Sequence, residues 1–262
     1  MAREFHGGRI GVGATILSDL AARLAKALYV PDLFLTTSSR AAADPDVHAK
    51  SLSDEWTLDA TARMSLDWEQ MFRMIAQQKL QIWMGAVQID RTGGSNISVI
   101  GSWDRPKAQL IGARGIPDDL WGCERLNFHI RTHSPKAIVE KVDFVCGFGS
   151  SPGFGEQSTK PAAPGIVVSD LGVFDFKGPD GTMQVVSLHP GVAFDTVQER
   201  TGFELPDPGP DVDVTPAPSA EELHVIRDVI DPLGLRRLDG SEGSPALMMD
   251  IWKQDLATGV AA

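Results

Sequence analysis

Apolar and polar positions along the first 37 residues follow the pattern of a strand, a helix and a second strand. The residues RIGVG at 9–13 form a short apolar run that ends in a glycine turn, which is typical of a strand end. The next stretch repeats apolar residues at helical spacing, on a face made of Ile16, Leu17, Leu20, Ala21, Leu24 and Leu28. After Pro31, the apolar run DLFLTT predicts another strand. This order favours a parallel sheet with helices packed on it.

The middle of the chain continues to alternate between helical and extended patterns. Residues 66–80 predict a second amphipathic helix, because their apolar positions recur at helical spacing. The apolar run IWMGAVQI at 82–89 has the length of a strand, and a glycine turn at 93–94 separates it from the returning strand NISVIG. Three later segments also read as strands: AQLIGARG (108–115), RLNFHI (125–130) and KVDFVCGFG (141–149).

The last third of the chain adds a loop, a hairpin and a capped helix. The stretch 147–165 is rich in Gly, Pro and Ser, and IVVSDLGVFDF and MQVVSLHPG predict a hairpin around KGPDG. A helix follows at 194–202, and Ser219 with Glu222 forms a capping-box pattern that opens another helix. We therefore expect an α/β domain over residues 1–235, with an open, mainly parallel sheet, flanking helices and an added β-hairpin region. Residues 236–262 are expected to form a loosely held tail.

Composition narrows the function classes. The chain has 262 residues, 42% of them apolar, which is enough for a sizeable buried core. Its net charge of −11 argues against non-specific nucleic-acid binding. Two cysteines, a start without an apolar signal region and the absence of a long apolar run predict a cytoplasmic protein with no membrane partner.

Three small motifs are more typical of structure than of a site. The GVGA turn at 11–14 lacks the third glycine of a dinucleotide fingerprint, so we interpret it as a tight strand-to-helix turn. His129 and His133 are four residues apart, but no acidic residue or cysteine completes a zinc-like spacing, so we predict no metal site. His189 reads as a strand-end histidine with a satisfied hydrogen bond.

The segment IGARGIPDD at 111–119 is the strongest candidate for a site. Gly112, Ala113, Arg114 and Gly115 directly follow an apolar run, and glycines let backbone N–H groups approach a ligand oxygen closely. Arg114 offers a permanently charged, forked donor for a carboxylate, a phosphate or a developing enolate. The alternative is a plain turn whose arginine pairs with a neighbouring aspartate, Asp118 or Asp119, and the sequence leaves both interpretations open.

A second polar stretch, QIDRTGGSN at 88–96, lies between two apolar runs. Gln88 and Asn96 could present buried amides to a cleft, although a simple hairpin turn explains the same pattern.

Taken together, these segments resemble the β subunit of a family I CoA-transferase. The opening RIGVGATILSDLAARLAKALYVPDLFL, the stretch GAVQIDRTGGSNIS, and later EKVDFV, GIVVSDLGVFDF and SLHPGV occur in the family's order, from about Arg9 to Leu235. The resemblance implies a fold like that of NagB, RpiA and the CoA-transferases. It also implies a CoA-transferase-like α subunit as partner, an α₂β₂ assembly, and an acyl-CoA substrate whose CoA is the only coenzyme.

Two departures from the family pattern bear on the reaction. Ser38 stands where the transferases carry the glutamate that attacks the thioester, and the usual Gly-x-Gly-Gly loop reads Gly112-Ala113-Arg114-Gly115. Both departures are similar to one branch, the CoA hydrolases that open the last steroid rings in cholesterol or bile-acid breakdown. A serine could not replace the carboxylate, because its acyl ester would be stable and no histidine lies nearby in sequence to activate it.

The resemblance therefore implies hydrolytic cleavage of a C–C bond in a cyclic β-keto acyl-CoA, with the general base supplied by a glutamate of the α subunit. Arg114 and Ser38 are the expected catalytic positions, and Gly112, Ala113, Gly115, Gln88 and Asn96 are expected to bind the substrate. Two alternatives stay open. The chain could belong to a true CoA-transferase that moves CoA between carboxylic acids, or it could be a non-catalytic subunit that only stabilises its partner.

Overall fold

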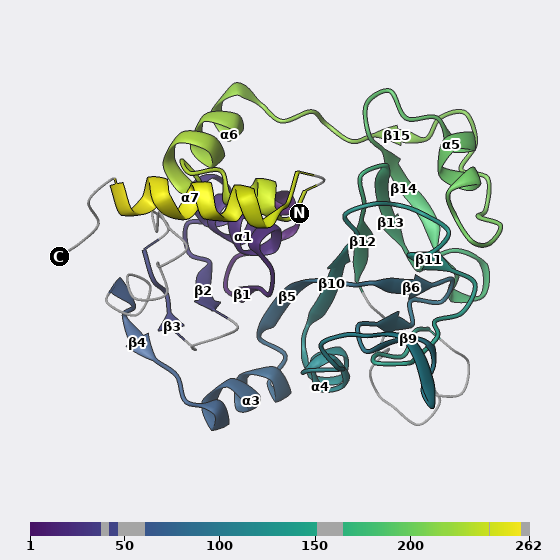
Figure 1. Cartoon of the computed structure of the whole chain (residues 1–262), viewed down its shortest axis with the longest axis horizontal. Helices are drawn as coiled ribbons and strands as arrows, with labels where there is room; N and C mark the ends of the chain where they lie inside the picture. Colours follow the sequence, from purple (N-terminus) through teal and green to yellow (C-terminus); the bar gives the residue numbers. More distant parts are fainter. Residues whose placement is uncertain (38–41, 47–60, 151–164, 241, 258–262) are drawn as a thin grey trace. The chain divides into compact units, whose positions relative to one another are not determined.

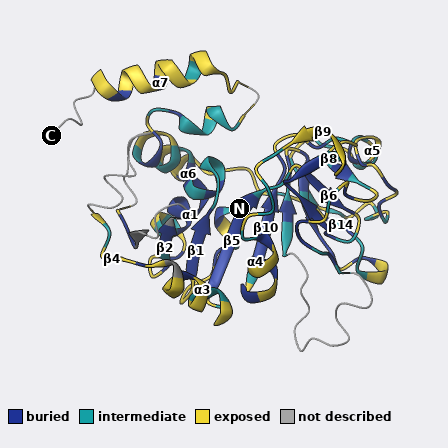
Figure 2. Cartoon of the chain, turned by 60° about the horizontal axis from the view of Figure 1, so that its bottom comes forward, coloured by how far each residue is buried: buried dark blue, intermediate teal, exposed yellow. Residues whose placement is uncertain are grey.

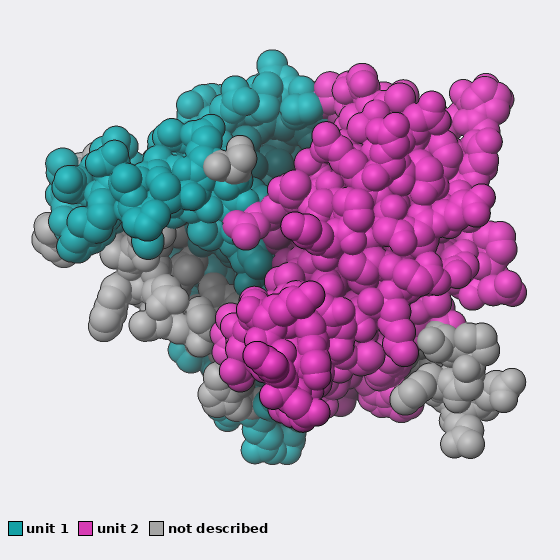
Figure 3. All heavy atoms as spheres, turned by 45° about the vertical axis from the view of Figure 1, so that its right-hand side comes forward, with its two compact units in different colours: residues 1–74, 79–83, 218–262 teal, residues 75–78, 84–217 magenta. Residues whose placement is uncertain are grey.

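The computed structural model of the chain describes residues 1–37, 42–46, 61–150, 165–240 and 242–257 (Figure 1). Contacts divide the chain into two compact units, coloured separately in Figure 3. Unit 1 comprises residues 1–74, 79–83 and 218–262, and unit 2 comprises residues 75–78 and 84–217. No helix in the described ranges is long and apolar enough to cross a membrane.

Unit 1 is built on three parallel strands, as the sequence predicts. β1 (Ile10–Gly13) lies between β2 (Phe34–Thr37) and β5 (Leu80–Gly85) and pairs with both in parallel. Short antiparallel strands, β3 (Ala42–Ala43) and β4 (Met64–Ser65), extend the β2 edge. Every residue of β1 is buried, which explains its continuous apolar run, and Figure 2 shows β1 and β5 in the buried colour.

Helix α1 (Ile16–Leu28) starts immediately after β1 and confirms the predicted strand-to-helix turn. Thr15 and Ser18 form a capping box at its start. Gly13 is required there, because a Cβ at this position would lie 2.2 Å from the backbone nitrogen of Asp19. The absence of a side chain at Gly13 therefore lets the end of β1 lie close to the start of α1.

Helix α3 (Trp68–Ala76) is shorter than the predicted span of 66–80. Gln78 adopts a left-handed backbone conformation, with φ of 59°, and its N–H donates to the carbonyl of Ile75. This turn ends the helix before β5 begins. The apolar pattern beyond Ala76 therefore belongs to the next strand.

The C-terminal part of the chain also belongs to unit 1. α6 (Ala220–His224) begins with the predicted capping box of Ser219 and Glu222 and continues as a π-helical segment, η3 (Val225–Ile230). Arg3, from the N-terminal turn η1 (Ala2–Glu4), binds the Glu222 carboxylate through two nitrogens, at 3.0 and 2.7 Å. The expected tail contains η4 (Leu235–Leu238) and α7 (Pro245–Ala257), where Ile251 is buried while most of the helix is exposed (Figure 2).

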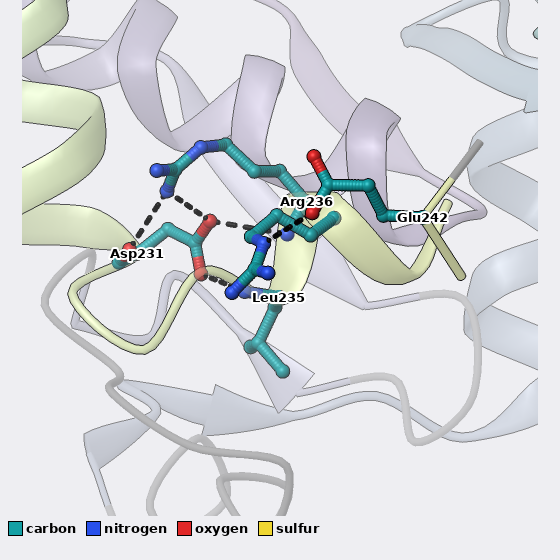
Figure 4. A network of polar contacts seen from close by, with 5 residues as sticks. Asp231, Leu235, Arg236 and Glu242 are labelled. Atoms are coloured by element: carbon teal, nitrogen blue, oxygen red, sulfur yellow. Dashed lines mark hydrogen bonds and ion pairs between the residues drawn. The ribbon is translucent and has the colours of Figure 1, made fainter. Parts of the chain in front are cut away.

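A buried aspartate shapes the turn before η4. Asp231 is 1% exposed, and its carboxylate accepts hydrogen bonds from the N–H groups of Leu235 and Arg236 at 2.6 and 3.1 Å. The guanidinium of Arg236 also forms an ion pair with this carboxylate, with 2.8 Å between Arg236 Nη1 and Asp231 Oδ2 (Figure 4). Such charge-assisted bonds to backbone donors fix a turn more firmly than neutral ones.

Unit 2 contains the predicted hairpin region. β10 (Arg125–His129) pairs in parallel with β12 (Ile166–Val168). The antiparallel strands β12, β13 (Gly172–Asp175) and β14 (Gln184–Leu188) follow in order, and the turn between β13 and β14 includes η2 (Pro179–Gly181). The predicted hairpin around KGPDG and the predicted helix, α5 (Phe194–Glu199), are both confirmed. β15 (Asp213–Val214) adds a short parallel edge.

The prediction of single strands at 82–89 and 96–101 is wrong in detail. The first run divides into β5 and β6 (Gln88–Asp90), and β6 belongs to a separate three-stranded sheet with β7 (Ser95–Asn96) and β11 (Ile138–Val139). The return divides into β7 and β8 (Val99–Ser102), which forms a hairpin with β9 (Arg105–Gln109).

Two other predicted strands are also corrected. In the segment 108–115, β9 ends at Gln109, and α4 (Ile116–Gly122) follows the glycine loop. The segment 141–149 makes only an isolated bridge, between Ser95 and Gly147. The Asp143 N–H donates to the Gln88 side-chain oxygen at 3.1 Å, so a side chain takes a backbone group that a ladder would otherwise use.

Candidate functional site

The glycine loop adopts an unusual backbone conformation. Gly112 has φ of 89° and Arg114 has φ of 55°, so a non-glycine residue occupies the left-handed region. Such a conformation costs on the order of 1 kcal/mol and persists only where the surroundings enforce it. The Ile116 N–H donates to the Ala113 carbonyl at 3.2 Å, which closes the loop onto α4. A strained turn that carries an arginine is a reason to expect function at this position.

Arg114 itself points to solvent. Its residue is exposed, and within the described ranges it forms no ion pair. Asp118 is exposed as well, whereas Asp119 is 7% exposed and lies beside Gly115 instead. The structure thus does not show the surface pair with Asp118 or Asp119 that the sequence left open, and the guanidinium has its donors available for a ligand.

Helix α4 holds the loop in place through two close contacts to glycines. A Cβ at Gly147 would lie 2.4 Å from Leu120 Cδ1 and 2.6 Å from Ile116 Cγ2. A Cβ at Gly122 would lie 2.4 Å from Ile75 Cγ2. These contacts leave no room for another side chain, so the helix is packed tightly at both ends and the loop has a fixed base.

Gln88 and Asn96 are brought together, as directly opposed residues of β6 and β7. The Asn96 amide donates to Gln88 Oε1 at 2.8 Å and to the Val99 carbonyl at 2.7 Å. Its oxygen accepts from the N–H groups of Ser98 and Val99, at 2.9 and 3.3 Å. The side chains are 5% and 0% exposed, so the interpretation as a hairpin is confirmed, and their expected contact with substrate stays a prediction.

The same network reaches Asp143. Gln88 Nε2 donates to Asp143 Oδ2 at 3.1 Å, and the N–H of Gly101 donates to the same oxygen at 2.9 Å. The Asp143 N–H in turn donates to Gln88 Oε1. These bonds tie β6, β7 and the β8–β9 hairpin to the segment that leads to Gly147, so they also support the packing of α4.

The turn between β6 and β7 explains Gly94. Asp90 Oδ1 accepts hydrogen bonds from the N–H groups of Thr92 and Gly94, at 3.0 and 2.8 Å. A Cβ at position 94 would lie 2.4 Å from Asp90 Oδ2. A larger residue there would require the Asp90 carboxylate to leave its place in the Asx turn.

Ser38 lies outside the described residues. The residue before it, Thr37, ends β2 and is paired with Gly13 of β1. Of the acids near it in sequence, Asp32 accepts from the Gly8 N–H at 3.1 Å, and Asp44 pairs with Lys26 at 2.5 Å and Arg63 at 3.0 Å. Both carboxylates are thus committed to structural contacts.

The remaining small motifs are structural. The N–H of Leu17 at the start of α1 donates to Asp239 Oδ2 at 3.2 Å, so a carboxylate of the chain itself occupies the position that a phosphate would take in a dinucleotide site. His189 Nε2 bonds to the Ser169 carbonyl at 2.9 Å, as expected. No group of three or more His, Cys, Asp or Glu residues in the described ranges is placed to hold a metal ion.

His133 is a buried neutral histidine. Its ring nitrogens lie 2.9 Å from Ser169 Oγ and 3.0 Å from Thr201 Oγ1. Burial lowers its pKa to about 4. The imidazole therefore stays uncharged at neutral pH and acts as a hydrogen-bonded core residue.

Comparison with known proteins places the chain in a family. No family model matches the chain. The "Cholesterol ring-cleaving hydrolase IpdB subunit" of Mycobacterium tuberculosis is 36% identical over 234 residues, which cover 85% of this chain and 87% of the relative. The chain belongs to this family of CoA-transferase-like β subunits.

Two further relatives support this assignment. The crystal structure of Rhodococcus jostii IpdAB matches with a TM-score of 0.76 and 33% identity, covering 90% of this chain and 92% of that one. One of the subunits of the 3-oxoadipate CoA-transferase of Pseudomonas knackmussii is 31% identical over 233 residues, covering 86% of this chain and 88% of the relative. The predicted membership and the predicted CoA-transferase-like fold are both confirmed.

The structure adds one residue to the site of this IpdB-like chain that the sequence did not single out. Burial, and to a smaller extent the charge of Asp118, raises the pKa of Asp119 to about 7. The sequence marked Asp119 only as a possible partner of Arg114. Its position two residues after the helix-opening Ile116-Pro117 pair was the available signal, because it places the side chain on the face of α4 that packs inward.

Proposed function

We propose that this chain is the β subunit of a hetero-oligomeric hydrolase that opens a ring of a cyclic β-keto acyl-CoA from steroid breakdown. The single observation that carries the proposal is the glycine loop, in which Arg114 is held in a strained conformation with its donors exposed. The names of the relatives support the substrate class. The name of the R. jostii structure denotes two kinds of polypeptide, which supports an α partner. We propose that the two subunits assemble as α₂β₂.

The proposed reaction needs a base and a site for negative charge. A base removes a proton from water, the hydroxide oxygen bonds to the ring ketone carbon, and the bond from that carbon to the α carbon breaks. Its electron pair moves onto the α carbon and the thioester oxygen as an enolate, which a proton then quenches. In this mechanism Arg114 and the N–H groups of Gly112–Gly115 stabilise the developing oxyanion, and Ser38, Gln88 and Asn96 shape the pocket.

The base itself is proposed to be a glutamate of the α subunit. The reaction consumes water and involves no change of oxidation state overall, so we propose no cofactor beyond the CoA that the substrate carries. Both cysteines of the chain are free and buried, which supports a reducing cytoplasmic location.

Arg114→Gly tests the role of the loop in the reconstituted complex. Glycine tolerates the left-handed backbone, so this variant removes the guanidinium and also relieves strain. We expect kcat/KM to fall about 10²–10³-fold, the usual cost of losing an oxyanion donor. The thermal stability should be unchanged or higher.

Arg105→Ala is the matched control, because it removes an exposed arginine from β9. Its turnover should stay near that of the wild type. Near wild-type turnover of Arg114→Gly as well would mean that the loop is structural, or that the chain only stabilises its partner.

A CoA-transferase is the second candidate, favoured by the 31% identity to the 3-oxoadipate CoA-transferase relative. Hydrolysis in water enriched in heavy oxygen separates the two. The proposed hydrolase places the label in the new carboxylate of the ring-opened product. A transferase instead forms a glutamyl–CoA thioester, which borohydride or hydroxylamine would trap on the protein, and such an adduct would reject the ring-opening proposal.

A further inference from the structure

Asp119 lies directly against the backbone of the glycine loop. A Cβ built on Gly115 would be 3.1 Å from Asp119 Oδ2 and 3.5 Å from Oδ1. The Asp119 N–H also donates to the Gly115 carbonyl at 2.8 Å, so the backbone of Asp119 is tied to the loop and its carboxylate lies beside Gly115. In the described part of the chain no cation and no side chain hydrogen-bonds to this carboxylate.

The helix cannot swing this carboxylate into water. The contacts of Gly147 with Ile116 and Leu120, and of Gly122 with Ile75, clamp α4 at both ends. Any charge on Asp119 therefore forms in place, 7% exposed, beside the donors of the loop. A charge at such a position acts at close range through a medium less polar than water.

The surroundings of Asp119 oppose its ionisation. Burial is the main cause of its raised pKa, and Asp118 is the charged neighbour that adds to it. Burial also raises the pKa of the Cys123 thiol, to which the charge of Asp119 contributes. The other titratable groups on the elements around α4 are Arg114 on the loop, Arg125 and His129 on β10, and Cys146 before Gly147.

We propose that Asp119 is a positioning residue that sets the charge felt at the Gly112–Gly115 loop. When it is neutral, the loop N–H groups and Arg114 are available to a developing oxyanion. When it is ionised, its negative charge opposes the oxyanion and attracts the guanidinium inward. The proposal rests on the proposed function in one respect, which is that negative charge develops at this loop.

The charge state predicts the form of the pH dependence. The step that develops the oxyanion should slow as the pH rises through the ionisation of Asp119, by on the order of tenfold. Asp119→Asn keeps the neutral shape, so this descending limb should disappear from the kcat profile between about pH 6 and about pH 9. Asp118→Asn is the matched control, because it removes the neighbouring charge and should move the limb to lower pH.

A measurement without substrate tests whether the ionisation of Asp119 is felt at the loop, independently of the reaction. Amide proton–nitrogen spectra of the labelled chain in the complex report the environment of Gly112 and Gly115 across the same pH range. Both amides should titrate with a common midpoint near neutrality. The titration should vanish in Asp119→Asn and shift to lower pH in Asp118→Asn.

These outcomes separate the two proposals. If the complex opens no cyclic β-keto acyl-CoA but the amides titrate as described, the proposed function fails and the coupling of Asp119 to the loop stands. If the amides do not titrate, or titrate equally in Asp119→Asn, the inference is overturned whatever the activity. A descending kcat limb that persists unchanged in Asp119→Asn also overturns it.

Discussion

Replacing Asn96 by alanine should destabilise unit 2 more than any surface change, because its amide makes four internal hydrogen bonds with nitrogen and oxygen partners, besides a weak one from Cys146 Sγ. The partners are Gln88 Oε1, the Val99 carbonyl and the N–H groups of Ser98 and Val99, all at 2.7–3.3 Å. Asn96 is 0% exposed, so water cannot take its place. At about 1 kcal/mol net for each bond, the variant should lose about 4 kcal/mol, reduced to about 3 kcal/mol by local relaxation.

Asn127 provides a matched control in the same unit. It is 1% exposed, so its truncation to alanine removes the same buried volume. Its oxygen accepts one bond, from the Ile166 N–H at 3.0 Å, while its Nδ2 has no partner among the described residues. Asn127→Ala should therefore cost only about 1 kcal/mol from hydrogen bonding. The two variants share the packing loss, so their difference isolates the network.

Urea denaturation followed by circular dichroism measures this difference. We expect the midpoint of Asn96→Ala to fall about 1 M further than that of Asn127→Ala, with similar slopes. Equal losses in both variants would refute the reasoning, because the number of hydrogen bonds would then not determine the cost. A stable Asn96→Ala with a raised KM would instead restore the interpretation of Asn96 as a substrate contact.

Three further outcomes follow from described contacts. Asp239→Ala should weaken the start of α1 by about 1 kcal/mol and reduce hydrogen-exchange protection at Leu17, since it removes a carboxylate from the helix N-terminus. His133 has a folded pKa of about 4 against 6.5, so wild-type stability should fall as the pH drops through that window, and His133→Gln should flatten the curve in thermal melts. Burial raises the pKa of Glu222, but hydrogen bonds, first from Arg3, outweigh it and lower the value to about 2. The contribution of Glu222 to the free energy of unfolding should be complete above pH 4.5 and should disappear as the pH falls towards 2. In acid denaturation, Glu222→Gln should therefore show a weaker dependence of stability on pH in this range than the wild type.

Elements whose signals are local were readable from the sequence. The β1–α1–β2 start depends on apolar periodicity and a glycine turn within a few residues, and the capping box of Ser219 is local as well. The hairpin of β13 and β14 carries its own turn residues. In each case the residues that decide the structure are neighbours in the chain.

Features that depend on distant partners were not readable. The apolar run at 82–89 breaks because Ala86 donates its N–H to the carbonyl of His129, which is far along the chain, and Val87 then joins the β6–β7 hairpin through Asn96. The burial of Asp119 depends in the same way on Gly147, whose missing side chain lets α4 pack inward. The periodicity of a sequence does not report such contacts. The composition of the Gly112–Gly115 loop was enough to predict a site there, but nothing local indicated that the Asp119 carboxyl group is buried beside it.

The interleaving of the two units has a consequence for how the chain matures on the ribosome. Unit 2 is formed almost entirely by the continuous stretch 84–217, so all its strands have been synthesised before residue 218 is added. In unit 1, Arg3 must wait for Glu222, and the start of α1 must wait for Asp239. The half of the molecule that is synthesised first is therefore the half that is finished last, and a nascent polypeptide arrested before residue 218 exposes an incomplete amino-terminal half to chaperones and proteases.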